Sequence, residues 1–227
     1  MFNVQSFNHW RMLALKCGMD VPAKVIASIG LQDLLKDDPT SAAVFVFFDE
    51  IRNASKRGSM LRWDMGVGQT VRDRLARGVW QYNKGDYNRL TLDEDWLEPL
   101  LEKHPDQGLV VWQRPWIKPV ILQKYPVGFR AFVENSKLIG VSNLYPQRPL
   151  PDNQSTLKDT NLVRWKTQAL IRKFPAHSIY NTDLEDSRLK PDEVNFTVDW
   201  MKTEDGLMFI SGSGPDLDAK IEGVQLK

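Results

Sequence analysis

Four cationic side chains lie at or near the ends of segments that are typical of strands, and they are the residues best suited to chemistry. They are Lys56, Arg114, Arg130 and Arg148. Arginine presents forked N–H donors to a phosphate, and lysine presents a point charge. Four cations converging on one cleft would suit a polyphosphate and its metal ion. The alternative is that each cation pairs with one of the 29 acidic side chains of the chain.

Arg130 is the most informative of these cations, because it interrupts an apolar strand pattern. Alternation along residues 129–134 places Arg130 on the same face as Phe132 and Glu134. A partly buried guanidinium cannot lose its charge, so it needs a carboxylate or a phosphate. Glu134 would lie about 13 Å away along an extended strand. The anion that pairs with Arg130 could therefore be a ligand phosphate or an acid on a neighbouring strand. In the first case this strand would form the floor of a ligand-binding site.

Two other segments carry groups that suit a phosphate or a metal. Arg52, Ser55 and Lys56 follow an apolar run and could hold phosphate oxygens, although this segment taken alone favours a solvated basic turn. Asp199 lies in a β-type run, where a buried carboxylate is costly unless it binds a metal or a cation. The alternative for Asp199 is a solvated face.

Several familiar sites are absent from the sequence. It has no GxxxxGK[ST] phosphate loop and no GxGxxG motif, and its three histidines are far apart. The single cysteine, Cys17, excludes an internal disulfide and indicates a reducing compartment. We therefore expect neither a structural zinc site nor a thiol nucleophile.

The composition is that of an ordinary globular domain. The 227 residues carry a formal net charge of +1, which argues against binding to nucleic acid or to a membrane surface. No apolar run approaches the roughly 20 residues of a membrane helix. Residues 1–6 lack the basic start and apolar run of a signal peptide. We expect a cytoplasmic protein.

The elements expected to position these residues are short helices followed by antiparallel hairpins. Asn8 is expected to cap a helix over residues 9–17 that ends at Gly18. Residues 25–35 are expected to hold a second helix, and residues 42–48 a strand buried on both faces. Further helices are expected at residues 70–79 and 91–101.

The second half of the chain is richer in strands. We expect a strand at residues 109–112, a hairpin around residues 135–137, and another hairpin joined through Glu204-Asp205-Gly206. A helix over residues 156–174 should place Leu162, Trp165, Ala169 and Leu170 on one face. The mixture predicts an α+β fold with antiparallel sheets and flanking helices, in two lobes at residues 1–108 and 109–227 that act as one functional unit.

Taken in order, four segments resemble the ATP-grasp superfamily, and in particular its clade of small phage and bacterial ligase-like proteins with eukaryotic cell-division-cycle relatives. Residues 52–56 are similar to a basic R-x-x-S-K turn, and residues 110–116 to an apolar strand ending in R-x-W. Residues 129–142 are similar to the P-x-E-F-R-x-F-V strand and its hairpin partner. Residues 196–215 are similar to the closing pair of strands and its glycine-proline loop.

This resemblance implies a two-lobed ATP-grasp-like fold that binds ATP and Mg²⁺. Active relatives join a carboxylate to an amine through an acyl-phosphate. By the resemblance, Lys56 would contact the ATP phosphates together with Arg52, Ser55 and Arg148. Arg114 and Arg130 would stabilise the phosphate or acyl-phosphate charge, and Asp199 would hold Mg²⁺.

The sequence departs from the pattern at several acidic positions. Gly128 stands where the pattern has Glu, Gln113 where many relatives have an acid, and Ser211 where a metal-binding acid is expected. Ser213 replaces a later Asn-like position. Two functions are therefore predicted: an ATP-dependent ligase with an unspecified acid and amine, or a catalytically degenerate phage scaffold with a protein partner, located in the host cytoplasm if the chain is viral.

Overall fold

The computed structural model describes residues 2–4, 6–30, 33, 42–54, 59–64, 108–145, 149–175, 178–179 and 194–214. The chain forms two compact units. One comprises Met1–Val21, Ile117–Asn181 and Asp186–Lys227, and the other comprises Pro22–Trp116 and Thr182–Glu185. The division therefore differs from the expected boundary at residue 108. The first 21 residues group with the C-terminal part of the chain, and residues 109–116 group with the other unit.

The larger unit is built on a four-stranded antiparallel sheet in the order β11-β10-β7-β8. Its strands are β7 (Gly128–Glu134), β8 (Lys137–Asn143), β10 (Phe196–Thr203) and β11 (Gly206–Ser213). Both expected hairpins are therefore confirmed. Asn135 and Ser136 have positive φ angles of 48° and 59°, which tight two-residue hairpin turns require.

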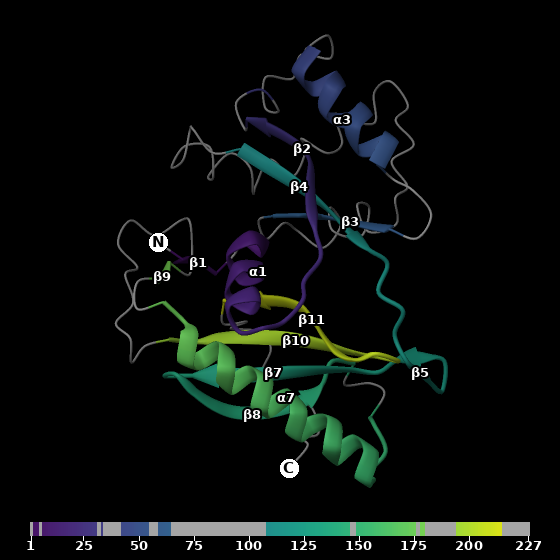
Figure 1. Ribbon diagram of the computed structural model, residues 1–227, viewed down its shortest axis with the longest axis vertical. Coiled ribbons are helices and arrows are strands. Elements are labelled where there is room, and N and C mark those ends of the chain that lie inside the picture. Colours follow the sequence, from purple (N-terminus) through teal and green to yellow (C-terminus); the bar gives the residue numbers. More distant parts are fainter. Residues whose placement is uncertain are drawn as a thin grey trace. The chain divides into compact units, whose positions relative to one another are not determined.

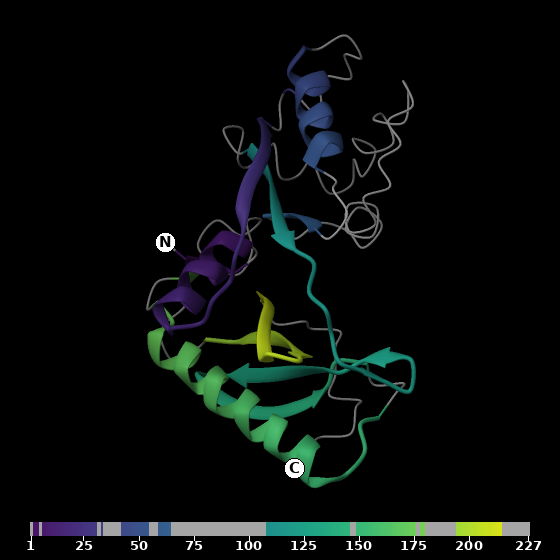
Figure 2. The ribbon, with the colours of Figure 1, turned by 45° about the vertical axis from the view of Figure 1, so that its right-hand side comes forward.

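Helices cover one face of this sheet. The helix α7 (Gln154–Lys173) runs along β7 and β8 in both ribbon views (Figures 1 and 2), and α1 (Phe7–Lys16) packs against β11. The centre of the covered face is apolar, and its most buried side chains are Ala131, Val141, Val198 and Trp200. At one end of this face Lys202 of β10 forms an ion pair with Asp159 of α7.

The cap and the apolar face of the two helices differ from the sequence-based expectations. Ser6, not Asn8, caps α1, because its hydroxyl accepts a hydrogen bond from the backbone N–H of His9.

The α7 helix is confirmed, but Trp165 points away from the sheet and is 64% exposed. Threonines Thr156, Thr160 and Thr167 take its place among the buried residues of the helix, because their short side chains allow a close approach to the sheet.

Four aromatic rings join the N-terminal segment to the sheet. Trp10 lies 5.2 Å from Phe2 and 5.1 Å from Phe196, measured between ring centroids. Phe174, just after α7, stacks on Phe196 at 4.9 Å. These contacts explain why the first 21 residues belong to this unit. A short parallel pair of strands, β1 (Phe2–Asn3) with β9 (Ser178–Ile179), lies beside them.

A small antiparallel hairpin completes the larger unit, with strands β5 (Ile121–Leu122) and β6 (Tyr125–Pro126). Two backbone hydrogen bonds tie its base to β10: Val120 N–H donates to the carbonyl of Lys202, and Lys202 N–H donates to the carbonyl of Val127. The hairpin therefore extends from the end of the sheet.

The second unit holds a three-stranded antiparallel sheet in the order β2-β4-β3. Its strands are β2 (Lys24–Gly30), β3 (Ser59–Trp63) and β4 (Gly108–Pro115). The expected helix at residues 25–35 is wrong for residues 25–30, which form β2. Pairing along β4 stabilises the strand there, and Val25, Ile26 and Ile29 suit it because they are β-branched.

The expected buried strand at residues 42–48 is also wrong. These residues begin the helix α3 (Ala42–Ala54), in which Phe47 and Ile51, one turn apart, are buried. Phe45 and Val46 are more than half exposed. A continuous apolar run does not distinguish a buried strand from a helix by its period, and here the run is the first half of a 13-residue helix. The helices expected at residues 70–79 and 91–101 lie outside the described residues.

Among the helices that the structure describes, none combines the length and the apolar content that crossing a membrane requires.

Gly212 marks the closest approach between α1 and the sheet, and it gives a stability prediction. A Cβ atom at residue 212 would lie 2.2–2.5 Å from three atoms of the fully buried Trp10 ring. We expect Gly212→Ala to lower the free energy of unfolding by about 1–3 kcal/mol through overpacking, as measured by urea denaturation. Ser211→Ala, on the same strand, is the control. Equal stabilities of the two variants would contradict this packing.

Candidate functional site

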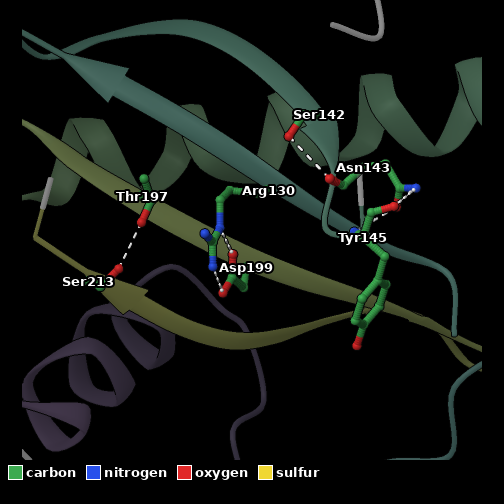
Figure 3. Close-up of polar contacts among 7 residues, drawn as sticks. All are labelled: Arg130, Ser142, Asn143, Tyr145, Thr197, Asp199 and Ser213. Atoms are coloured by element: carbon green, nitrogen blue, oxygen red, sulfur yellow. Dashed lines mark hydrogen bonds and ion pairs between the residues drawn. The ribbon is translucent and has the colours of Figure 1, made fainter. Parts of the chain in front are cut away.

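A polar face lies on the side of the four-stranded sheet opposite the helices (Figure 3). We use this name for the face that carries Arg130, Ser142, Thr197, Asp199, Ser211 and Ser213. The cross-strand register aligns its side chains, because directly paired residues in an antiparallel sheet share one face. The central row across the four strands reads Ser211, Asp199, Arg130, Ser142.

An ion pair between neighbouring strands occupies the middle of this row. Arg130 on β7 donates from Nε to Asp199 Oδ1 at 2.7 Å and from Nη2 to Oδ2 at 2.9 Å. The fork of the guanidinium thus meets both carboxylate oxygens, which is the geometry that arginine and carboxylate favour. The side chains are 28% and 16% exposed, so the pair is partly buried but open to a ligand.

Hydroxyl groups flank this pair. Thr197 on β10 and Ser213 on β11 share a hydrogen bond of 2.7 Å between their hydroxyl oxygens. Ser142 on β8 donates to the backbone carbonyl of Asn143 at 3.3 Å. Ser142 and Thr197 are buried, whereas Ser211 and Ser213 are partly exposed. The polar face therefore offers an oriented cation with its counter-ion and two serine hydroxyls, a set that suits phosphate or sugar oxygens.

Tyr145 extends from the end of β8 and is held there by its backbone (Figure 3). The side-chain amide of Asn143 donates to the carbonyl of Tyr145 at 2.7 Å and accepts from its N–H at 3.2 Å. Burial raises the pKa of the Tyr145 hydroxyl above its ordinary value, and the negative charge of Asp199 raises it further. The sequence pattern did not point to Tyr145, because its place beside Asp199 depends on strand register.

The structure brings together only some of the residues predicted from the sequence. Arg130 and Asp199 are adjacent, as described. Arg114 is 1% exposed within β4, in the other compact unit. Arg52 lies in the last turn of α3, not in a turn after a strand, and pairs with Asp49 of the same helix. Ser55, Lys56 and Arg148 lie outside the described residues.

Two of the departures from the ATP-grasp pattern are built into the local packing. A Cβ atom at Gly128 would lie 2.9 Å from Leu144 Cδ2 and 3.3 Å from the carbonyl oxygen of Trp200. Gln113 donates to the carbonyl of Ala54 at 2.6 Å and to the hydroxyl of Ser59 at 3.1 Å. The first position has no room for a larger side chain without rearrangement, and the second has a structural role in its own sheet.

The described residues do not fit a protein-held Mg²⁺ ion. Mg²⁺ prefers several oxygen ligands, with carboxylates supplying the negative charge. Asp199 is the one carboxylate among the residues of the polar face, and both of its oxygens bond to Arg130. In the part of the chain that the structure describes, no group of three or more His, Cys, Asp and Glu side chains could hold a metal.

Solved structures resemble this chain over almost its whole length, whereas no protein-family model and no curated protein sequence matches it. C-terminally truncated Cdc123 from Schizosaccharomyces pombe is similar with a TM-score of 0.52 and 15% identity, covering 95% of this chain and 86% of that chain. Cdc123 from the same organism gives 0.50 and 17%, covering 94% and 85%. The chain therefore shares the fold of Cdc123. The resemblance to the clade with cell-division-cycle relatives is thereby confirmed for the fold, as is the α+β class.

A weaker likeness relates the chain to D-alanine–D-alanine ligase from Bacillus anthracis complexed with ATP. The TM-score is 0.41 and the identity 12%, over 93% of this chain and 53% of that chain. At this TM-score the likeness alone does not establish a common fold.

The raised pKa of Tyr145 gives a prediction that tests the electrostatic influence of Asp199. Asp199→Asn removes the charge but not the burial, so the pKa of Tyr145 should fall toward its ordinary value without reaching it. Because the pKa of Tyr145 is higher in the folded state than in the unfolded state, Tyr145 contributes to the free energy of unfolding at any pH below the ordinary tyrosine pKa. This contribution is lost as the pH rises through the folded-state pKa. Absorbance titration of the phenolates measures the shift, and Tyr145→Phe identifies the signal among the five tyrosines. An unchanged pKa of Tyr145 in Asp199→Asn would contradict this electrostatic influence.

Proposed function

We propose that this chain binds ATP on the polar face of the four-stranded sheet. The observation that carries the proposal is Arg130, a partly exposed guanidinium held in one orientation by Asp199 among serine and threonine hydroxyls. A cation fixed in advance stabilises negative charge without the cost of reorganising at the moment of binding. The ATP-grasp-like fold and the order of the sequence motifs support a nucleotide as the ligand.

The finer proposal is an ATP-dependent carboxylate–amine ligase. In this reaction a substrate carboxylate attacks the γ-phosphorus of ATP and releases ADP, giving an acyl-phosphate. An amine then attacks the acyl carbon and releases inorganic phosphate, leaving an amide. Arg130 and Arg114 would stabilise the charge of the transferring phosphoryl group. Lys56, Arg52, Ser55 and Arg148 would contact the phosphates of ATP.

The second candidate is a catalytically degenerate scaffold, and the packing around Gly128 favours it. Leu144 and Trp200 occupy the space that an acid at this position would need, and Ser211 stands where a metal-binding acid is expected. The 64% exposure of Trp165, on the side of α7 away from the sheet, supports a role in contacting another protein. This candidate is a structural or host-interaction protein of a phage. A strictly monomeric protein with robust ATP turnover would exclude it.

Both candidates are proposed to act in the cytoplasm, and in the host cytoplasm if the chain is viral. The single cysteine of the sequence, Cys17, which allows no internal disulfide, supports that proposal.

Isothermal calorimetry of ATP with the full chain tests the proposed function. We expect saturable binding by the natural protein in a buffer containing Mg²⁺. Arg130→Ala should weaken it about tenfold or more, because hydrogen bonds to charged groups contribute roughly 1.5–3 kcal/mol. Lys56→Ala should also weaken binding. Lys137→Ala, which removes an exposed cation at the first residue of β8, is the matched control.

Thermal unfolding of each variant shows whether it is folded at the temperature of the titration. The absence of any ATP binding by the natural protein would contradict the proposed function. An affinity unchanged in folded Arg130→Ala would remove Arg130 from the site, and the same result in Lys56→Ala would remove Lys56.

A further inference from the structure

The carboxylate of Asp199 sits where the ATP-grasp resemblance places a metal ligand, yet it has a different partner. Its two oxygens lie 2.7 and 2.9 Å from Nε and Nη2 of Arg130. We infer that Asp199 is the counter-ion of Arg130, and that the polar face binds its phosphate ligand without a divalent cation held by the protein. The part that concerns the ligand rests on the proposed ATP binding, whereas the part that concerns Asp199 does not.

The first argument is electrostatic. A metal ion bound to Asp199 would lie within a few ångströms of the Arg130 guanidinium, and the charge of arginine cannot be removed by deprotonation. Such an ion would therefore have to displace Arg130 from a bidentate contact that is 16–28% exposed and only partly screened by water. The pair neutralises itself and leaves no net negative charge to attract a cation.

The second argument is the chemistry of the neighbours. The residues directly paired with this ion pair are Ser211 on the Asp199 side and Ser142 on the Arg130 side. The adjacent row contributes Thr197 and Ser213, whose hydroxyls bond to each other. Neutral hydroxyls donate well to phosphate oxygens but add no charge to a cation site.

The two arguments lead to one ligand class. A face with an oriented guanidinium and neutral donors suits the phosphate groups of a nucleotide directly, with no metal bridge between the phosphates and the protein. ATP affinity should therefore depend little on Mg²⁺. A metal-bridged site would lose affinity when the cation is chelated.

Binding of Mn²⁺ to the full chain without nucleotide tests the role of Asp199, with electron paramagnetic resonance of free Mn²⁺ as the readout. We expect the natural protein and Asp199→Asn to give the same Mn²⁺ titration. Asp159→Asn, which alters the partner of Lys202 at another partly buried ion pair, is the matched control. A saturable Mn²⁺ site that is lost in folded Asp199→Asn and kept in Asp159→Asn would overturn the inference.

A second measurement uses the natural protein alone, so it does not depend on the folding of a variant. We expect the dissociation constant of ATP in EDTA to lie within about twofold of its value in Mg²⁺. A loss of tenfold or more in EDTA, equivalent to about 1.4 kcal/mol, would overturn the metal-free binding mode. If ATP fails to bind in both buffers, the proposed function fails, while the Mn²⁺ titration still decides the role of Asp199.

Discussion

The ion pair between Arg130 and Asp199 is the constraint on which the polar face of the larger unit depends. It joins the two central strands, β7 and β10, through residues that are directly paired in the sheet. A slip of β10 by one residue against β7 would carry Asp199 to the face that α1 and α7 cover and would separate it from Arg130. The pair therefore helps to specify the strand register as well as the chemistry of the face. The two hydrogen bonds that orient Arg130 also occupy both carboxylate oxygens of Asp199, which a metal ion would otherwise bind.

The opposite face of the sheet determines where the helices α1 and α7 pack in this unit. Its apolar side chains are packed so closely that Gly212 on β11 lies directly against the ring of Trp10. This packing explains why the N-terminal helix belongs to the same unit as strands nearly 200 residues later. On the other face, Gly128 lies against Leu144 and the carbonyl of Trp200, so a larger side chain at this position would require its neighbours to move.

Much of this unit could be predicted from the sequence, because its signals are local. Alternation and turn residues predicted both hairpins, and the apolar setting of Arg130 predicted that it needs an anion. The identity of that anion could not be predicted, because Asp199 is 69 residues away and reaches Arg130 only through strand pairing. Tyr145 was missed for the same reason. The errors at residues 25–30 and 42–48 arose where short apolar segments suit helix and strand equally, so that tertiary pairing decides between them. The inward face of α7 was misassigned because threonines, and not its tryptophan, meet the sheet.

The most direct test of this account is a double-mutant cycle on Arg130 and Asp199, measured as the free energy of unfolding in urea. The single variants Arg130→Gln and Asp199→Asn each leave one partly buried charge without its partner, whereas the double variant removes both. We predict a coupling energy of about 1–3 kcal/mol, with the double variant more stable than the sum of the single losses implies. Additive losses, with a coupling below about 0.5 kcal/mol, would contradict the claim that this pair organises the sheet and its polar face.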